Sequence, residues 1–270
     1  MGGPEPNDTG LWRAVYEYLA LGLGWGLLGI LCLLWLPITA LLYPLMPEAL
    51  GWRLGRRVIR GGCRLYLRWL ILLGACRFDL GELDALRDAA PLILAPNHPS
   101  LLDAVLVISR VPDLAVVLKA GLLRNPLLGP AIRLARWIPN DSLPGTIRQA
   151  RSNLDRGSHL LLFPEGTRTA DPPLGPLKAS VGLIARRSGR PVQTLLIETD
   201  SGYLGKGWPM LRKPRLPVRY RVRLGRRFDP PQDVRAFTAE LELYLGSELR
   251  GTRVGRSESG DGRPVRPAIG

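Results

Sequence analysis

No charged residue occurs between Glu17 and Glu48, and this stretch constrains the fold more than any other feature of the chain. A straight helix of that length would be about 45 Å long, against roughly 30 Å for the hydrocarbon core of a membrane. The stretch must therefore tilt strongly or break, and Pro37 is the natural place for a break. One tilted span and a re-entrant pair of short helices both fit. Residues 1–50 are expected to form an N-terminal membrane anchor.

Two other interpretations of this stretch fit less well. A secretory signal peptide would begin with basic residues and carry a shorter apolar run, whereas this chain begins with Glu5, Asp8 and Glu17. A buried core helix is the second alternative, but uncharged runs of this length are rare in soluble domains.

A strongly basic segment follows the apolar stretch at once. Its arginines recur at steps of three and four, which places most of them on one face of a helix opposite an apolar face. This pattern predicts an interfacial helix on anionic lipid headgroups, with the basic side cytoplasmic. A solvated basic face on an ordinary helix is the alternative. The arginines are Arg53, Arg56, Arg57, Arg60, Arg64 and Arg68.

The whole chain is basic, with 37 Lys and Arg against 23 Asp and Glu and a formal net charge of +14. Such an excess calls for an acidic partner, which can be a nucleic acid, an anionic membrane or an acidic substrate. Zinc-finger spacing, a heptad repeat after a basic region and an RRM-type aromatic signature are all missing, which argues against nucleic acid. Three cysteines and two histidines are too few for a disulfide framework or a histidine-rich metal site.

Beyond about residue 77, short apolar runs alternate with amphipathic stretches, which predicts an α/β fold with a mixed central sheet covered by helices. We expect a single domain over residues 51–250, with the basic helix at its start, and a disordered tail over residues 251–270. The last predicted strand alternates in polarity, so we place it near a sheet edge. Strands are expected at 91–95, 114–118, 159–163, 192–197 and 218–224, and helices at 101–109, 124–135, 145–155, 177–188 and 233–248.

The first motif that carries chemistry is Asn97-His98-Pro99-Ser100-Leu101-Leu102-Asp103, directly after a predicted strand. Pro99 keeps His98 out of the helix, and Ser100 can cap a helix that starts near Leu101. Asp103 in the first turn can then reach back to His98. A histidine oriented by a carboxylate is a general base, because the carboxylate fixes the imidazole tautomer and stabilises the cation.

A capping box is the alternative interpretation of this motif. In Ser100-x-x-Asp103, the carboxylate would only satisfy backbone N–H groups at the start of the helix.

The second motif, Phe163-Pro164-Glu165-Gly166-Thr167-Arg168-Thr169, also follows an apolar strand. Gly166 allows close backbone approach, Thr167 offers a hydroxyl, and Arg168 can hold a phosphate with two hydrogen bonds. Glu165 could orient a ligand hydroxyl or pair with a basic residue. An ordinary polar turn between a strand and a helix is the alternative.

Taken together, the two motifs resemble those of the PlsC-like glycerolipid acyltransferases, whose blocks are Asn-His-x4-Asp and Phe-Pro-Glu-Gly-Thr-Arg. The resemblance covers roughly residues 90–200. It implies that His98 and Asp103 are the catalytic pair, and that Glu165, Gly166, Thr167 and Arg168 bind the acyl acceptor and its phosphate.

An intermediate block of the family is partly present. The segment from Lys119 to Gly129 is similar to it, which implies that Lys119 approaches the acceptor. Trp137-Ile138-Pro139-Asn140 stands where many members have Ile-Asp-Arg, so that arginine is missing. The amino-acid sequences of the first motif and of residues 200–208 resemble those of a bacterial subgroup associated with aryl-polyene or xanthomonadin-type pigment lipids.

The resemblance implies a membrane-bound O-acyltransferase that moves an acyl chain from acyl-CoA or acyl-carrier protein to a hydroxyl of a lysophosphatidate-like acceptor. It also implies a place at the cytoplasmic (inner) membrane, on the cytoplasmic side, with anionic lipid as a partner. No metal and no other cofactor is expected, because a thiolate already leaves readily.

The alternatives are an acyltransferase for a pigment-type lipid and a non-catalytic membrane-binding module. A serine hydrolase would need a G-x-S-x-G elbow, which the sequence lacks. His159 lies outside both motifs and is expected to be structural.

Overall fold

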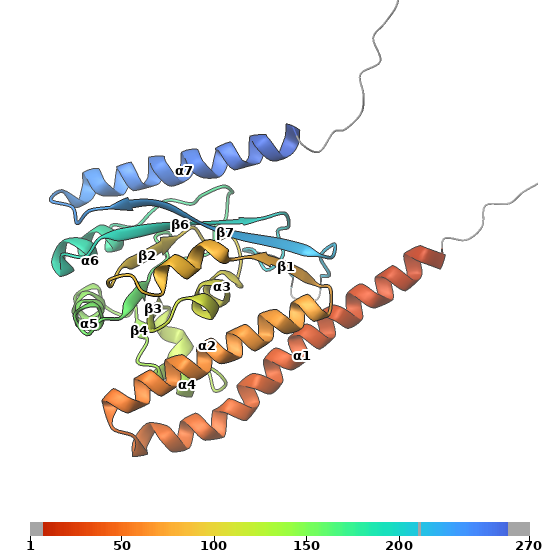
Figure 1. Ribbon diagram of the computed structural model, residues 1–270, viewed down its shortest axis with the longest axis horizontal. Helices are drawn as coiled ribbons and strands as arrows, with labels where there is room; N and C mark the ends of the chain where they lie inside the picture. The colour runs from red at the N-terminus through yellow and green to blue at the C-terminus, as the bar shows by residue number, and fades with distance from the viewer. Residues whose placement is uncertain (1–7, 210–211, 259–270) are drawn as a thin grey trace, which may run out of the picture.

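The computed structural model, in which residues 8–209 and 212–258 are described, begins with a helical hairpin (Figure 1). Helix α1 (Asp8–Leu45) runs through Pro37 without interruption, so of the two alternatives the structure has the continuous helix and not the break at Pro37. A proline removes one helical hydrogen bond and bends a helix, and a long helix can accommodate both. The chain reverses instead at Met46 and Pro47, and α2 (Glu48–Leu72) packs back along α1.

The segment Trp12–Leu41 of α1 is long and apolar enough to cross a membrane, judged by its length and composition. Many of its large side chains are exposed, among them Leu23, Leu33 and Leu41. Helix α1 nevertheless touches the rest of the chain, since the buried Glu17 carboxylate accepts a hydrogen bond from Lys213 Nζ at 2.6 Å. The N-terminal helix is therefore joined to the remainder of the protein by a specific ion pair.

Helix α2 does not present its basic face as the sequence predicts. Arg56 is buried and donates to the carbonyl of Ala135 and to the side chains of Asp113 and Asn153. Arg60 and Arg64 donate to main-chain carbonyls at the end of a neighbouring helix. Half of the six arginines thus attach α2 to the α/β domain, and a headgroup-binding face would consist of the exposed Arg53, Arg57 and Arg68.

A seven-stranded sheet lies beyond the hairpin, in the order β1-β7-β6-β2-β5-β3-β4. All described pairs are parallel except β6 with β7, which confirms the expected mixed sheet. Strand β7 is next to the edge strand β1, as its alternating pattern predicts. The strands are β1 (Cys76–Asp79), β2 (Ile93–Pro96), β3 (Leu114–Leu118), β4 (Ile138–Pro139), β5 (His159–Leu161), β6 (Val192–Thr199) and β7 (Val218–Phe228).

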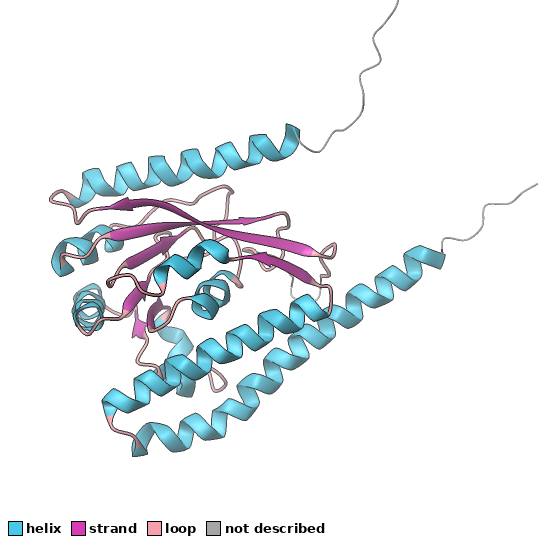
Figure 2. Cartoon of the chain, in the orientation of Figure 1, coloured by secondary structure: helices cyan, strands magenta, loops and turns pink. Residues whose placement is uncertain are grey.

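Helices cover both faces of the sheet and create two apolar cores (Figure 2). One core lies under α1, α2 and α3, and the other lies under α5, α6 and α7. The remaining helices are the 3-10 turns η1 (Gly81–Leu86) and η2 (Ala120–Arg124), and the α-helices α3 (Asp103–Arg110), α4 (Gly129–Leu134), α5 (Leu143–Asp155), α6 (Ser180–Ser188) and α7 (Val234–Glu258).

Two predicted boundaries differ from the structure. The expected helix 124–135 is split into η2 and α4, because Pro126 cannot continue the hydrogen-bonded turn before it. Helix α7 continues to Glu258, so residues 251–258 are helical and the prediction of a disordered tail is wrong for them. The rest of that predicted tail lies outside the described residues.

Candidate active site

Both motifs lie at the carboxyl ends of neighbouring parallel strands. His98 follows β2, the segment Phe163–Arg168 follows β5, and Lys119 follows β3, while β2, β5 and β3 are adjacent in the sheet. Loops at this edge of an open parallel sheet are where α/β proteins place their ligands. The sheet order therefore brings together residues separated by more than sixty positions in the sequence.

His98 and Asp103 are in direct contact. His98 Nδ1 lies 2.8 Å from Asp103 Oδ2, and the Asp103 side chain is fully buried while that of His98 is 15% exposed. An ionised Asp103 accepts the Nδ1 proton, which leaves Nε2 with its lone pair. Within the described residues, Nε2 has no hydrogen-bond partner. A histidine oriented in this way by a carboxylate can act as a general base through Nε2.

Asp103 also fulfils the capping interpretation. Its Oδ2 accepts the N–H of Ser100 at 2.7 Å, as the carboxylate of a capping box would. Helix α3 begins at Asp103 itself, a little later than expected, and Ser100 is held in the loop by the carbonyl of Tyr203. One carboxylate oxygen therefore both starts the helix and orients the histidine.

Burial changes the acidity of this carboxyl group. It raises the pKa of Asp103 to about 6, although the hydrogen bond from His98 opposes the rise. Asp103 Oδ1 has no hydrogen-bond partner in the described part of the chain. A buried carboxylate that lacks a partner for one oxygen disfavours folding, which is typical of a group retained for function.

The His98 loop is clamped by the second motif. The backbone N–H of His98 donates to Glu165 Oε1 at 2.9 Å, and the carbonyl of His98 accepts the N–H of Thr169 at 2.8 Å. The His98 ring also stacks on Phe163, with ring centroids 3.8 Å apart. The backbone and ring of His98 are thus fixed on three sides.

Glu165 has a role other than the one the sequence suggests. Its Oε1 accepts the hydroxyl of Thr169 as well as the His98 N–H, and its Oε2 accepts the N–H of Gly175 at 2.8 Å. With three donors and only 3% exposure, Glu165 holds two loops together. Both carboxylate oxygens therefore accept hydrogen bonds from the protein. This geometry does not support the predicted contact between Glu165 and a ligand hydroxyl.

Arg168 is partly engaged by the protein. Its Nη1 donates to the carbonyls of Leu204 and Gly205 at 2.9 and 2.8 Å, which ties the turn to the segment 201–208. Its Nε and Nη2 have no hydrogen-bond partner among the described residues. Gly166 has φ +68° and, like Thr167, is exposed. One edge of the guanidinium and the tip of the turn are open to a ligand.

Two lysines flank the second motif. Lys119, which the resemblance implies approaches the acceptor, is exposed at the end of β3. Among the described residues, its side chain makes no hydrogen bond or ion pair with the other site residues. Sequence reasoning missed Lys178, whose side chain lies so close to Gly166 that an added Cβ would meet Nζ at 2.6 Å. Lys178 follows a run of small and proline residues without a recognisable pattern, so only the fold reveals it.

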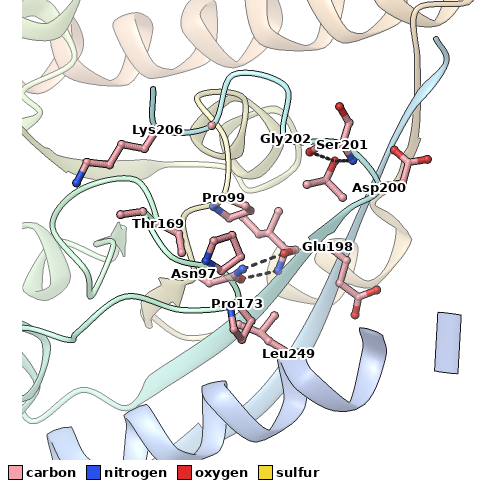
Figure 3. A pocket seen from close by; sticks show the side chains of 15 residues that line it. Asn97, Pro99, Thr169, Pro173, Glu198, Asp200, Ser201, Gly202, Lys206 and Leu249 are labelled. Carbon is pink, nitrogen blue, oxygen red and sulfur yellow. Dashed lines mark hydrogen bonds between the residues drawn. The ribbon is translucent and has the colours of Figure 1, made fainter. Parts of the chain in front are cut away.

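A pocket of about 340 Å³ with a mixed polar and apolar lining opens beside the His98 loop (Figure 3). Asn97, Pro99 and Thr169 line it from the two motifs, and Lys206 lines it from the segment 201–208. Asn97 exchanges two hydrogen bonds with the backbone of Ile197, which fixes the pocket wall to β6. The pocket offers space for a polar group next to the catalytic loop.

An apolar groove of about 670 Å³ lies between α1, α2, α3 and α4. Ala104 and Val105, which directly follow Asp103 in the chain, are among the residues that line it. Its wall is almost free of polar groups and includes Leu28, Leu31 and Trp35 of α1. The groove fits an alkyl chain.

His159 lies at the opposite end of the sheet, at the start of β5. Its Nδ1 accepts the N–H of Leu92, and burial lowers its pKa. It is a structural histidine, in agreement with the expectation from sequence.

The oriented His–Asp pair at the carboxyl edge of the sheet is compatible with acyl transfer. Residues 77–198 match the family model described as Acyltransferase. A 1-acyl-sn-glycerol-3-phosphate acyltransferase from Pseudomonas aeruginosa is 23% identical over 180 residues, which are 64% of this chain and 68% of the relative. Residues 77–198 are therefore similar to the Acyltransferase family, and this match to the family model covers less than half of the chain.

Two further relatives define the extent of the similarity. A chloroplast 1-acyl-sn-glycerol-3-phosphate acyltransferase from Brassica napus is 28% identical over 120 residues, which are 42% of this chain and 35% of that protein. The match thus spans about a third of the length of the plant relative. The crystal structure of PlsC from Thermotoga maritima superimposes with a TM-score of 0.68 at 18% identity, covering 89% of this chain and 98% of that one. That likeness establishes the fold.

Proposed function

We propose that this protein transfers an acyl group from a thioester donor, acyl-CoA or acyl-carrier protein, to the hydroxyl of a lysophosphatidate-like lipid at a membrane surface. The contact between His98 Nδ1 and the fully buried Asp103 is the observation that carries this proposal. The family match and the relatives named 1-acyl-sn-glycerol-3-phosphate acyltransferase support it.

In the proposed reaction, His98 Nε2 removes the proton of the acceptor hydroxyl as its oxygen attacks the thioester carbonyl. Asp103 holds the Nδ1 proton and stabilises the imidazolium that forms. The tetrahedral intermediate collapses, the C–S bond breaks, and the thiolate takes the proton back from Nε2. The products are an ester and a free thiol, and neither a metal nor an acyl-enzyme is required.

The lipid parts of the substrates are assigned to the apolar groove between α1 and α4. Ala104, the residue after Asp103 in the chain, is among the residues that line this groove, which supports the assignment. The exposed leucines of α1 and the span Trp12–Leu41 support delivery of the lipid from a membrane. We place the catalytic domain at the cytoplasmic face of the inner membrane.

The acceptor phosphate is assigned to the open edge of Arg168, the exposed tip of Gly166 and Thr167, and Lys119 at the next strand end. The Nε and Nη2 of Arg168, which have no hydrogen-bond partner in the part of the chain that the structure describes, form an edge that can bind two phosphate oxygens. Glu165 takes no part in this contact, since both of its oxygens accept protein donors.

Purified full-length protein tests the proposal directly. We expect release of free thiol from acyl-CoA or acyl-carrier protein that depends on added lysophosphatidate and yields a diacyl product. Transfer to a neutral hydroxylated lipid instead would replace the acceptor assignment with a pigment-type one. Absence of transfer from both donors to every acceptor would refute the proposed activity.

Membrane attachment has a separate test. Leu33→Lys together with Leu41→Lys places charge on the exposed side of α1. We expect this variant to move largely into the soluble fraction after lysis, while wild type sediments with membranes. A wild-type chain found in the soluble fraction would contradict the membrane assignment.

A further inference from the structure

A second groove, of about 830 Å³, lies between α5 and α6, on the face of the sheet opposite α1 and α2. Its floor is apolar and its rim carries arginines, a composition unlike that of the site at the carboxyl edge. We call it the arginine groove. Its defining residues are Leu143, Ile147 and Leu183 on the floor and Arg148, Arg151 and Arg187 on the rim.

Positive charge dominates this groove. Among the described residues, Asp155 is the only carboxylate that lines it, and Arg151 and Arg190 share that group in ion pairs of 3.6 and 4.0 Å on the exposed surface. Arg148 and Arg187 are exposed and have no carboxylate partner among the described residues. Unpaired arginines around an apolar floor suit a partner with carboxylates surrounding an apolar side chain.

One end of the arginine groove lies at the edge of the sheet that carries His98. Helix α5 begins at Leu143, soon after β4 ends at the carboxyl edge, and α6 begins at Ser180. The start of α6 is tied to the second motif, because the N–H of Lys178 donates to the carbonyl of Pro164 at 2.9 Å. A partner seated between the helices would therefore have a short path around their N-terminal ends to the catalytic loop.

The position of the groove favours a protein partner over a lipid surface. The exposed apolar side chains of α1 lie beyond the first core, whereas α5 and α6 cover the second core on the other sheet face (Figure 1). A flat membrane in contact with α1 would not reach the arginines of α5 and α6 at the same time. An acidic protein in solution would reach the arginines of α5 and α6.

We propose that the arginine groove is the docking site for an acidic acyl-carrier protein, the macromolecular form of the thioester donor. Carboxylates of the carrier pair with Arg148, Arg151 and Arg187, and one of its apolar side chains rests on Leu143, Ile147 and Leu183. The thioester arm then passes the start of α5 to reach His98. This inference rests on the proposed acyl transfer and adds the surface that selects the donor.

The test compares two charge-reversed proteins, both full-length and in detergent. Arg148→Glu with Arg187→Glu alters the groove, while Arg77→Glu with Arg219→Glu makes the same charge change on exposed, paired positions of β1 and β7 at the far end of the sheet. Binding of fluorescent holo-acyl-carrier protein is measured by anisotropy at low and high salt. Transfer kinetics are measured with acyl-carrier protein and with acyl-CoA.

We expect the groove variant to weaken carrier binding and raise the KM for acyl-carrier protein at least tenfold at low salt, with acyl-CoA kinetics and the control variant unchanged. Carrier binding within twofold of wild type, or equal losses with both donors, would overturn the docking site. Loss of binding to anionic phosphatidylglycerol vesicles with intact carrier binding would assign the groove to the membrane instead. Carrier binding that depends on the groove, without transfer from either donor, would leave the docking site standing and refute the proposed activity.

Discussion

The two motifs of the carboxyl edge use their charged side chains in opposite ways. In the first, His98 Nε2 and Asp103 Oδ1 have no hydrogen-bond partner in the described part of the chain. In the second, Glu165 is saturated by three donors, and Arg168 commits Nη1 to two carbonyls. Unsatisfied groups are available for chemistry, whereas saturated ones hold the backbone. In the proposed reaction, the first motif is therefore the reactive half of the site, and the second is chiefly its frame.

The largest effect is expected from the reactive half. His98→Ala should lower kcat by roughly 10²–10⁴-fold, because no other described group can take the acceptor proton at that position. The free energy of unfolding should change little, since the ring is a partly exposed loop side chain. Thermal unfolding and initial rates are measured on the same preparation. The matched control is His159→Gln, which should lower stability and leave kcat near wild type; a normal rate for His98→Ala would remove the base assignment.

The frame should respond differently. Glu165→Gln puts an N–H₂ group against one of three donors, which should reduce the free energy of unfolding by about 1–3 kcal/mol and lower activity together with it. Thr169→Val removes one donor and should produce a smaller loss in the same direction. Chemical denaturation and kcat are the measurements. A large rate loss for Glu165→Gln at unchanged stability would place Glu165 among the reacting groups.

A pH profile distinguishes the two halves again. Burial raises the pKa of Asp103 to about 6, so its carboxylate gains a proton as pH falls through that value and no longer accepts the Nδ1 proton of His98. We expect kcat/KM at pH 5 to be about a tenth of its plateau. The same acid limb should remain in Glu165→Gln. A profile that is flat down to pH 5 would contradict the role of Asp103.

The smallest effect concerns the open edge of Arg168. Arg168→Ala should raise the KM for lysophosphatidate about threefold to tenfold more than the KM for a neutral hydroxylated acceptor, because the phosphate loses a two-point contact. Arg168→Lys should restore only part of the affinity, since a point charge cannot reproduce that geometry. Equal losses on the two acceptors would limit Arg168 to holding the segment 201–208.

The sequence is sufficient for those parts of the fold that depend on local pattern. Buried parallel strands such as β3 appear as apolar runs, and Pro99 separates His98 from the helix that carries Asp103, so the pair could be predicted. The two-residue strand β4 is too short to leave a periodic signal. The polar strand β1 depends on pairing with β7, more than a hundred residues away.

Long-range contacts explain the remaining differences. The sequence predicts that Arg56 binds lipid headgroups, but in the folded protein its side chain donates to Asp113 and Asn153, which lie far from it in the sequence. The sequence predicts that Glu165 contacts a ligand, but its Oε1 accepts the N–H of His98, which is 67 residues away in the chain. A charged residue in a motif reveals its chemical type, but whether its bonding capacity is already used depends on the tertiary structure.

Asp103→Asn tests the central claim most directly, because the capping and catalytic interpretations predict different outcomes for it. The raised pKa means that ionised Asp103 destabilises the native state as pH rises above about 4 and through about 6, so an uncharged residue removes that penalty. At pH 8 we therefore predict a kcat at least a hundredfold below wild type, with a free energy of unfolding that is equal or higher. A rate within twofold of wild type, accompanied by a clear loss of stability, would make Asp103 a helix cap and contradict the account.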